Sequence, residues 1–423
     1  MKSVWILQTG EPIPGDPGTP RKLRAYNLAE KLAEKNVHVT IWTSRFNHTN
    51  KSHRESSEGY VYSDFIEVRF LESPGYTNNI SLARLIDHFI LALNFRKVLK
   101  KVEATPDLLF IGFPPIELAF IATKWAQRNS ISTILDFKDL WPEIFLNVFQ
   151  GKFKSLLKFL FSPFFYMSQF SISKVDALIS ISEPFLNKAL IISGRKKTHR
   201  DLVIPLTTDN AIKRTNKGKE DVELIFENIS YKKGKDHIIS FAGTFMVDVF
   251  DFTILKDTLD ELSKRGISLK IILAGDGQER AQWERIFSDC DDILFTGWVN
   301  QELLTRIQEE SLAVLIPLKE REDFSLSIPN KAIDALSKGK IILTGTESFL
   351  SQSIQANEAG FKYRDFMHLS DIIESLISNK EKQLRFESNA LDFYETEFEF
   401  NMAYEKLLDL MFSMTEEHGR EQR

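Results

Sequence analysis

The charged residues of this 423-residue chain that most suggest binding chemistry are Lys331 and Asp334. They lie in SIPNKAIDALSKGKIIL, residues 327–343, which predicts a helix that begins near Pro329 and ends before Gly339. Lys331 falls in the first turn, where the helix dipole disfavours a cation by about 0.3 kcal/mol or more. A bound anion would offset this cost, because it would pair with both the ammonium group and the dipole.

Asp334 is three residues further on, so a helix presents both side chains on one face. The carboxylate could accept hydrogen bonds from a ribose diol while Lys331 binds a diphosphate. The alternative is a local surface ion pair between the two residues, which would contribute little to stability.

Glycine recurs where strand-like segments end, in both halves of the chain. Ligands bind at the carboxyl ends of strands in open parallel sheets, and glycine lets the backbone approach them closely. Any one of these glycines could instead be a plain turn. The chain has neither a G-x-G-x-x-G fingerprint nor a phosphate-binding loop, which argues against hydride transfer and nucleotide hydrolysis. The glycines are Gly10, Gly15, Gly18, Gly243, Gly275, Gly277 and Gly297.

Apolar strand-like segments alternate with longer segments of helical periodicity along the whole chain. Such alternation predicts parallel sheets covered by helices on both faces, and two sets predict two doubly wound α/β domains. A polar, charge-rich stretch near 205–236 is the expected boundary. The predicted divisions are a first domain over 1–205, a second over 206–395, a helix over 396–415 and a tail over 416–423.

Composition indicates a soluble globular protein. Hydrophobic residues make up 43% of the chain and charged residues 27%, and the lone Cys290 suits a reducing cytosol. The N-terminus does not resemble a secretory signal, and no stretch is long enough to span a membrane. Residues 1–205 carry 27 Lys and Arg against 19 Asp and Glu, whereas residues 206–423 carry 27 against 40. The basic half could face phosphates or an acidic membrane, or merely be solvated; no nucleic-acid-binding pattern is present.

Several of these segments together resemble the GT-B nucleotide-sugar glycosyltransferases, in particular the retaining family-4 type that builds bacterial surface polysaccharides. The resemblance extends over nearly the whole chain and is most specific at residues 327–343. It implies two Rossmann-like domains that face one another across a cleft. The segments that carry it are GEPIPGDPGTPRKLRAYNLAEKLAEKNVHVTIWTS, ILDFKDLWPE, FAGTF, LAGDGQE, FTGWV and SIPNKAIDALSKGKIIL.

The resemblance assigns the donor diphosphate to Lys331 and the donor ribose to Asp334. Three features depart from the family pattern. Asp334 stands where the family has a glutamate, and Leu326 stands where the family has an earlier acid. The residues after the strand that precedes Gly243 include no Lys or Arg, although the family carries basic residues there. By resemblance the donor-binding residues are Gly18, Gly243, Thr244, Gly275, Gly277, Gly297, Trp298, Pro329, Lys331 and Asp334.

On the acceptor side, Lys138 stands where many relatives carry a histidine. It could steady a departing phosphate or a bound sugar, and Asp139 could orient a sugar hydroxyl or cap a helix. With Lys331, these two residues form the predicted catalytic set. His48 and His53 lie in a loop of the basic half, where acceptor contacts are expected; a solvated loop is favoured over a metal site. Neither a metal nor another cofactor is expected.

Residues 153–170, FKSLLKFLFSPFFYMSQF, mix large aromatic side chains with Lys154 and Lys158. Basic amphipathic segments of this kind lie at membrane interfaces, although a buried helix would have a similar composition. The prediction is a cytoplasmic protein that associates peripherally with the inner face of the membrane.

The resemblance therefore predicts a retaining hexosyl- or N-acetylhexosaminyltransferase. It would move a sugar from a nucleoside diphosphate, expected to be UDP, onto a lipid-linked or oligosaccharide acceptor in lipopolysaccharide or other polysaccharide synthesis. Two alternatives remain open: a GT-B sugar-nucleotide epimerase, and a non-catalytic protein that binds nucleotide sugars.

Overall fold

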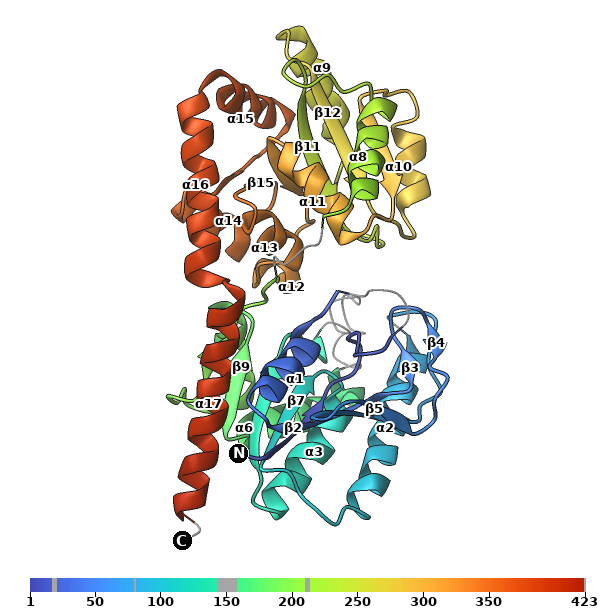
Figure 1. Cartoon of the computed structure of the whole chain (residues 1–423), viewed down its shortest axis with the longest axis vertical. Helices are drawn as coiled ribbons and strands as arrows, with labels where there is room; N and C mark the ends of the chain where they lie inside the picture. The colour runs from blue at the N-terminus through green and yellow to red at the C-terminus, as the bar shows by residue number, and fades with distance from the viewer. Residues whose placement is uncertain (17–20, 80, 144–157, 210–213, 422–423) are drawn as a thin grey trace. The chain divides into compact units, whose positions relative to one another are not determined.

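The computed structural model describes residues 1–16, 21–79, 81–143, 158–209 and 214–421. The chain divides into two compact units. Unit 1 comprises Met1–Pro205 and Asn401–Arg423, and unit 2 comprises Leu206–Phe400. Each unit is an open sheet covered by helices, as the alternating sequence pattern predicts (Figure 1).

Unit 1 is built on an eight-stranded sheet of order β10-β9-β8-β7-β1-β2-β6-β5. Its strands are parallel except β5, which pairs antiparallel to β6 at one edge. The central strands β7 and β8 are buried at every position, because helices cover both faces. A separate hairpin pairs β3 with β4. The strands are β1 (Ser3–Leu7), β2 (His38–Ser44), β3 (Phe46–Asn47), β4 (Ser52–His53), β5 (Gly59–Ser63), β6 (Ile66–Leu71), β7 (Leu108–Phe113), β8 (Ser132–Phe137), β9 (Ala177–Ser180) and β10 (Leu202–Val203).

The helices of unit 1 include the last helix of the chain, α17. Helix α2 begins after Ser81, whose side chain accepts a hydrogen bond from the Arg84 amide (3.2 Å). In α17, Lys406 donates to the Val203 carbonyl (3.1 Å), which ties the chain's end to this unit. The helices are α1 (Arg24–Glu34), α2 (Leu82–Leu99), α3 (Ile116–Arg128), α6 (Ser162–Lys174), α7 (Glu183–Ser193) and α17 (Phe400–Glu421).

Unit 2 is built on a six-stranded parallel sheet of order β13-β12-β11-β14-β15-β16. Its core contains a cluster of phenylalanine rings in which Phe241 packs edge-on against Phe245, Phe250 and Phe252. The strands are β11 (His237–Ala242), β12 (Leu269–Ala274), β13 (Ile293–Gly297), β14 (Ala313–Ile316), β15 (Ile341–Thr344) and β16 (Gly360–Lys362). The helices are α8 (Asn216–Asn228), α9 (Leu255–Lys264), α10 (Arg280–Ile286), α11 (Gln301–Glu310), α12 (Glu322–Ser325), α13 (Asn330–Leu336), α14 (Phe349–Ala356), α15 (Phe366–Ser378) and α16 (Lys380–Glu397).

Both sheets contain a point at which the strand order reverses. In unit 1 the chain proceeds from β1 to β2 on one side, while β7 pairs with β1 on the other. In unit 2 it proceeds from β11 to β12, while β14 pairs with β11 on the other side. The crevice outside the carboxyl ends of such neighbouring strands is where open α/β sheets bind ligands.

Some predicted boundaries differ from the observed ones. The helix expected over 396–415 begins at Phe400 and continues to Glu421, so the segment predicted as a tail from 416 onward is largely helical. The stretch 205–236 contains helix α8, whose N-cap residue Thr215 bonds to Glu302 of α11.

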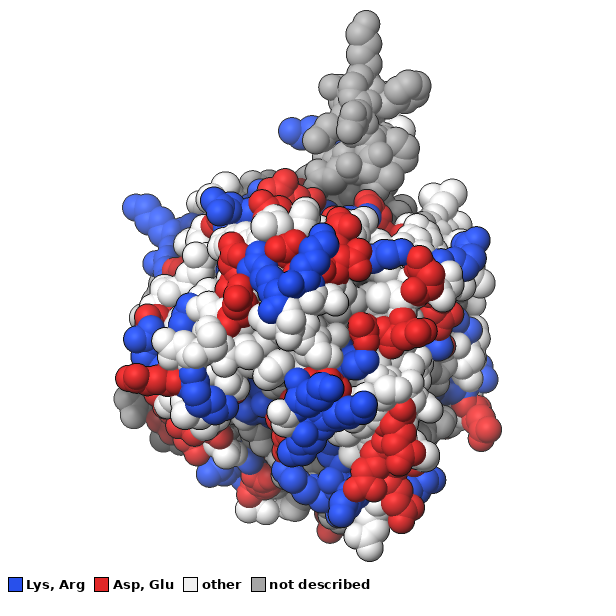
Figure 2. Space-filling view, turned by 90° about the horizontal axis from the view of Figure 1, so that it is seen from above, with Lys and Arg blue, Asp and Glu red and all other residues white. Residues whose placement is uncertain are grey.

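The face shown in Figure 2 carries charges of both signs side by side. In Figure 2, Lys and Arg lie next to Asp and Glu over most of the displayed face. No helix in the described part of the chain combines the length and the apolar character that crossing a bilayer requires.

Candidate functional site

The loops that follow β11, β12 and β13 touch one another at their glycines. The Gly243 amide donates to the Ala274 carbonyl (3.0 Å), and the Gly275 amide donates to the Gly297 carbonyl (2.7 Å). Gly275 has φ +136°, and a Cβ there would lie 1.9 Å from the Gly243 oxygen. Glycine is therefore needed here for the close approach of two loops, and the amides of Gly243 and Gly275 are already engaged.

Lys331 reaches from α13 to this junction. A Cβ on Gly243 would lie 2.5 Å from the Lys331 Nζ, so the ammonium group occupies the space that this glycine leaves open. Nζ lies 3.9 Å from the centroid of the Phe250 ring and 4.8 Å from that of Phe241. We call Gly243, Gly275, Gly297 and Lys331 the Lys331 cluster. It lies at the reversal point of the unit 2 sheet.

The charge of Lys331 is not compensated by any residue that the structure describes. Its ammonium group makes neither an ion pair nor a hydrogen bond within the described ranges, so the alternative of a Lys331–Asp334 surface pair is excluded. Desolvation alone lowers its pKa from 10.5 to about 7. An anion bound beside Lys331 would reverse this shift and restore the full charge.

The other predicted donor-side residues lie around this cluster with different exposure. Asp334 is partly buried in α13, one turn after Lys331, and Pro329 is the N-cap residue of that helix. Gly277 has φ +149°, and a Cβ there would lie 2.6 Å from the Phe245 oxygen. Thr244 is exposed, and so is Trp298, at 75%. Gly18 lies outside the described residues.

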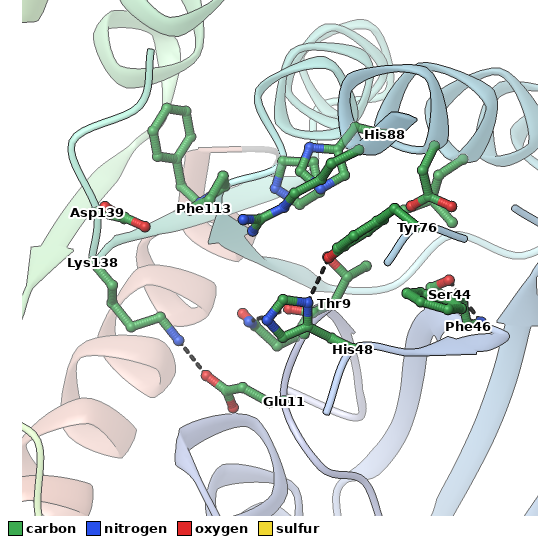
Figure 3. A pocket seen from close by; sticks show the side chains of 17 residues that line it. Thr9, Glu11, Ser44, Phe46, His48, Tyr76, His88, Phe113, Lys138 and Asp139 are labelled. Carbon is green, nitrogen blue, oxygen red and sulfur yellow. Dashed lines mark hydrogen bonds and ion pairs between the residues drawn. The ribbon is translucent and has the colours of Figure 1, made fainter. Parts of the chain in front are cut away.

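Unit 1 has a cavity of about 210 Å³ at the reversal point of its own sheet (Figure 3). We call it the unit 1 cavity. Its walls come from the loops after β1, β3, β6, β7 and β8, from the ends of β2 and β7, from β3 and from α2. The predicted residues His48, Lys138 and Asp139 line it, as does Gly10, whereas Gly15 and His53 do not. His53 instead bonds to the Ser73 carbonyl through Nε2 (2.8 Å).

Lys138 is held in a network of buried charges. It forms an ion pair with Glu11 and lies 3.3 Å from Asp136, which also pairs with Arg24 (3.2 Å). Burial works against the charge of Lys138, but Glu11 and Asp136 outweigh it and raise the pKa. The Arg24 guanidinium also donates to the Ile204 carbonyl (2.6 Å), at the end of the first part of unit 1. The charge of Lys138 is thus compensated within the protein.

Asp139 and His48 face the unit 1 cavity from two sides. Oδ1 of Asp139 accepts a hydrogen bond from the Leu140 amide (2.8 Å). Nδ1 of His48 lies 2.5 Å from the Tyr76 hydroxyl and 3.3 Å from the Lys51 ammonium. Because an ammonium group only donates, Nδ1 is the acceptor and Nε2 carries the proton. Desolvation, aided by the charges of Lys51 and Arg84, lowers the pKa of His48 to about 4, so the ring is neutral at pH 7.

Sequence reasoning missed residues that the fold brings to both sites. Gln8, Tyr76, Arg84 and His88 line the unit 1 cavity, and the four-residue spacing of Arg84 and His88 on one helix is a signal that could have identified the latter two. Arg280 lies close to the Lys331 cluster, because a Cβ on Gly297 would lie 3.0 Å from its Nη1. Within the described residues, no group of three His, Cys, Asp or Glu side chains is arranged to hold a metal ion.

Comparison with known proteins finds that part of unit 2 is similar to a family of enzymes. Residues 236–379, about a third of the chain, match the family model "Glycosyl transferases group 1". This segment contains the whole Lys331 cluster. No curated protein sequence matches the chain.

Solved structures share the fold over nearly the full length of the chain. Sucrose-phosphate synthase from Thermosynechococcus elongatus has a TM-score of 0.69 at 14% identity, covering 98% of this chain and 99% of that one. Anabaena Alr3699/HepE in complex with UDP has a TM-score of 0.62 at 14% identity, covering 98% and 100%. WaaG, a glycosyltransferase involved in lipopolysaccharide biosynthesis, has a TM-score of 0.63 at 14% identity, covering 96% and 99%. The predicted α/β GT-B fold is confirmed.

Proposed function

We propose that this protein is a retaining glycosyltransferase that transfers a hexosyl or N-acetylhexosaminyl group from a UDP-sugar to a saccharide acceptor. In this proposal the donor diphosphate binds at the Lys331 cluster and the acceptor binds in the unit 1 cavity. The match of residues 236–379 to the group 1 glycosyltransferases and the fold shared with the UDP complex of Alr3699/HepE support it.

The observation that carries the proposal is the uncompensated charge of Lys331. Its ammonium group rests on the rings of Phe241 and Phe250 at a glycine-lined junction, and desolvation lowers its pKa to about 7. A buried cation without a carboxylate partner is costly to maintain, and perturbed groups of this kind concentrate at functional sites. A diphosphate would supply the missing negative charge.

The chemistry follows from where charge develops during transfer. Breaking the bond between the anomeric carbon and the phosphate oxygen leaves negative charge on the nucleoside diphosphate. Lys331 would stabilise this charge most strongly in the transition state, because it is held in place before the reaction. Asp334, one turn further along α13, would accept hydrogen bonds from the ribose, and Asp139 would orient an acceptor hydroxyl. No metal is assigned a role.

Turnover with a panel of nucleotide sugars tests the proposal directly. We expect a folded Lys331→Ala protein to transfer sugar about 100-fold more slowly or worse, the cost of removing one preorganised donor. The exposed Lys217, which has no described partner, provides the matched control, and Lys217→Ala should transfer at the wild-type rate. Unchanged transfer by Lys331→Ala would contradict the diphosphate assignment.

The same assays separate the two alternative functions. An epimerase would convert the donor sugar without an acceptor, and a non-catalytic protein would bind the nucleotide sugar without turnover. An epimerase needs several acids and bases around the donor sugar. The match of residues 236–379 to the group 1 glycosyltransferases makes transfer the favoured reaction.

Apolar side chains exposed on unit 1 support association with an anionic membrane. Such association would suit a lipid-linked acceptor in lipopolysaccharide or other polysaccharide synthesis. Of residues 153–170, only 158–170 are described. There Phe159 is 75% exposed and Tyr166 58% exposed, so the described residues 158–170 do not form a buried helix. Helices α2 and α6 both pack against α3. On α2, a second stripe of exposed apolar side chains is followed by basic residues at the end of the helix. The stripe is Leu82, Ile86, Phe89 and Leu93, and the basic end is Arg96, Lys97, Lys100 and Lys101.

Vesicle sedimentation tests this surface. Each basic residue near an anionic surface contributes about 1 kcal/mol, and salt screens it. Replacing Lys154 and Lys158 with glutamate should release the protein from anionic vesicles, while transfer to a soluble acceptor continues. Vesicle binding that depends on neither lipid charge nor salt would contradict an interfacial role for this basic segment.

A further inference from the structure

We propose that the unit 1 cavity binds a saccharide that carries a negatively charged substituent, with the anion at Arg84 and the sugar hydroxyls at Gln8 and His88. The inference rests on the proposed function, in which this cavity holds the acceptor. It adds the chemical class of that acceptor.

Arg84 and Lys51 both lie over the ring of Tyr76. The Arg84 guanidinium carbon is 5.4 Å from the ring centroid, and the Lys51 ammonium is 4.6 Å from it. Neither cation forms an ion pair with a described residue. Two like charges on one ring repel each other, and a bound anion would relieve that repulsion.

Arg84 is held in position and still has a donor to offer. Its guanidinium stacks 4.6 Å from the Trp141 ring centroid, and Nη1 donates to the Asn79 carbonyl (2.8 Å). Its buried Nε has no hydrogen-bond partner among the described residues. The carboxylate of Asp87, also on α2, accepts a hydrogen bond from the Gly75 amide (2.6 Å) and does not pair with Arg84. A preorganised guanidinium with an open donor is suited to a carboxylate or a phosphate.

Two other buried polar groups of the cavity lack partners among the described residues. His88 is only 5% exposed, and its Nδ1 makes no hydrogen bond to a described residue. Its pKa is lowered to about 3, first by desolvation and then by the positive charge of Arg84, so the ring is neutral. Gln8 is 6% exposed, and its Oε1 is likewise without a described partner. Neutral rings and amide oxygens suit hydroxyl groups rather than anions.

The dimensions of the cavity limit the ligand. About 210 Å³ is below the roughly 300–1,000 Å³ of pockets that enclose drug-sized molecules, so one sugar residue suits it. Lys138 lies on the far side with its charge compensated by Glu11 and Asp136, which leaves Arg84 as the lining cation available to an anion. Figure 3 shows His48 and Tyr76 on one side of the cavity and Lys138 and Asp139 on the other.

Isothermal titration calorimetry of the full chain at low salt tests the inference. The ligands are glucose, glucuronate, glucose 6-phosphate and inorganic phosphate. We expect glucuronate or glucose 6-phosphate to bind at least tenfold more tightly than glucose, and the better of the two identifies carboxylate or phosphate. Inorganic phosphate should bind at least tenfold more weakly than the better acidic sugar. Equal affinities for glucose and both acidic sugars, absence of binding by all of them, or phosphate binding as tight as that of the sugars would overturn the inference.

Variants identify the residue responsible. Arg84→Gln should remove the preference for the acidic sugar while glucose binding stays within twofold. Arg96→Gln, an exposed position on the same helix, should keep the preference. If Arg84→Gln fails to fold, Lys51→Gln, at a more peripheral position, should reduce the preference at least threefold. An unchanged preference in the folded variants would overturn the assignment. Titration of the same samples with UDP measures binding at the donor site alone. Loss of UDP binding would therefore contradict the proposed function independently of the result for the acidic sugars.

Discussion

Lys138 in unit 1 and Lys331 in unit 2 are both largely buried lysines at the reversal point of a parallel sheet, but their surroundings differ. Lys138 lies beside Glu11 and Asp136, which raise its pKa. Lys331 lies on two phenylalanine rings, and desolvation lowers its pKa to about 7. The charge of Lys138 is compensated by neighbouring carboxylates, whereas in our proposal the charge of Lys331 is compensated by a bound ligand.

The largest expected effect is a loss of stability in unit 1, where the charge of Lys138 is compensated. Asp136 is fully buried, and Asp136→Asn would leave Arg24 and Lys138 facing only Glu11. We expect a loss of about 3–5 kcal/mol in the free energy of unfolding of unit 1, the usual cost of breaking a buried ion pair. Urea unfolding followed by tryptophan fluorescence measures it, because four of the six tryptophans lie in unit 1.

Glu72, which pairs with Arg45 and is 51% exposed, provides the control for Asp136. Glu72→Gln should cost less than about 1 kcal/mol. If Asp136→Asn cost no more than the control, the charge network of Lys138 would not be structural.

Substitution of Lys331 is expected to raise the free energy of unfolding, the opposite of the effect at Asp136. The unfolded chain binds the lysine proton with a pKa near 10.5 and the folded protein with a pKa of about 7, so the cost of the buried charge is fully present below pH 7. Lys331→Met should therefore stabilise the ligand-free protein at pH 6, by about 1.4 kcal/mol or more, the free energy that corresponds to a tenfold change in proton affinity. The gain should shrink as the pH approaches 10.5. Calorimetry at pH 6 and pH 9 measures this difference, and destabilisation at pH 6 would contradict it.

A smaller effect is expected at Asp334. Asp334→Asn keeps the shape of the side chain but weakens its ability to accept hydrogen bonds from a ribose diol. UDP affinity should fall by more than twofold and up to about tenfold, or 1.4 kcal/mol, with little change in stability. Asp260→Asn, on the exposed face of α9, is the control. Affinity within twofold of wild type would mean that Asp334 is only a helix residue.

The sequence predicted the fold well because the buried parallel strands are continuous apolar runs. β7 and β8 are buried at every residue, and such segments stand out between polar helices. Strand β5, at an edge, is half exposed and mixed in composition, so it has no comparable signal. The length of α17 was underestimated because its last turns are polar.

The sequence predicted some residues of the candidate sites and missed others. Lys331 was identified because its position at a helix start and its motif both point to an anion. The role of Gly243 in leaving space for Nζ depends on contact between segments almost 90 residues apart, which local pattern does not encode. Arg84 and His88 were missed because the residues they contact, such as Trp141, lie far away in the sequence.

UDP binding as a function of pH tests the central claim, that Lys331 binds the donor diphosphate, most directly. The free protein must take up a proton on Lys331 when the anion binds above pH 7, so affinity should fall about tenfold between pH 7.5 and pH 8.5. Lys331→Met should bind UDP more weakly and without this dependence. Wild-type affinity that does not change over this range, or that falls equally in Lys331→Met, would contradict the claim.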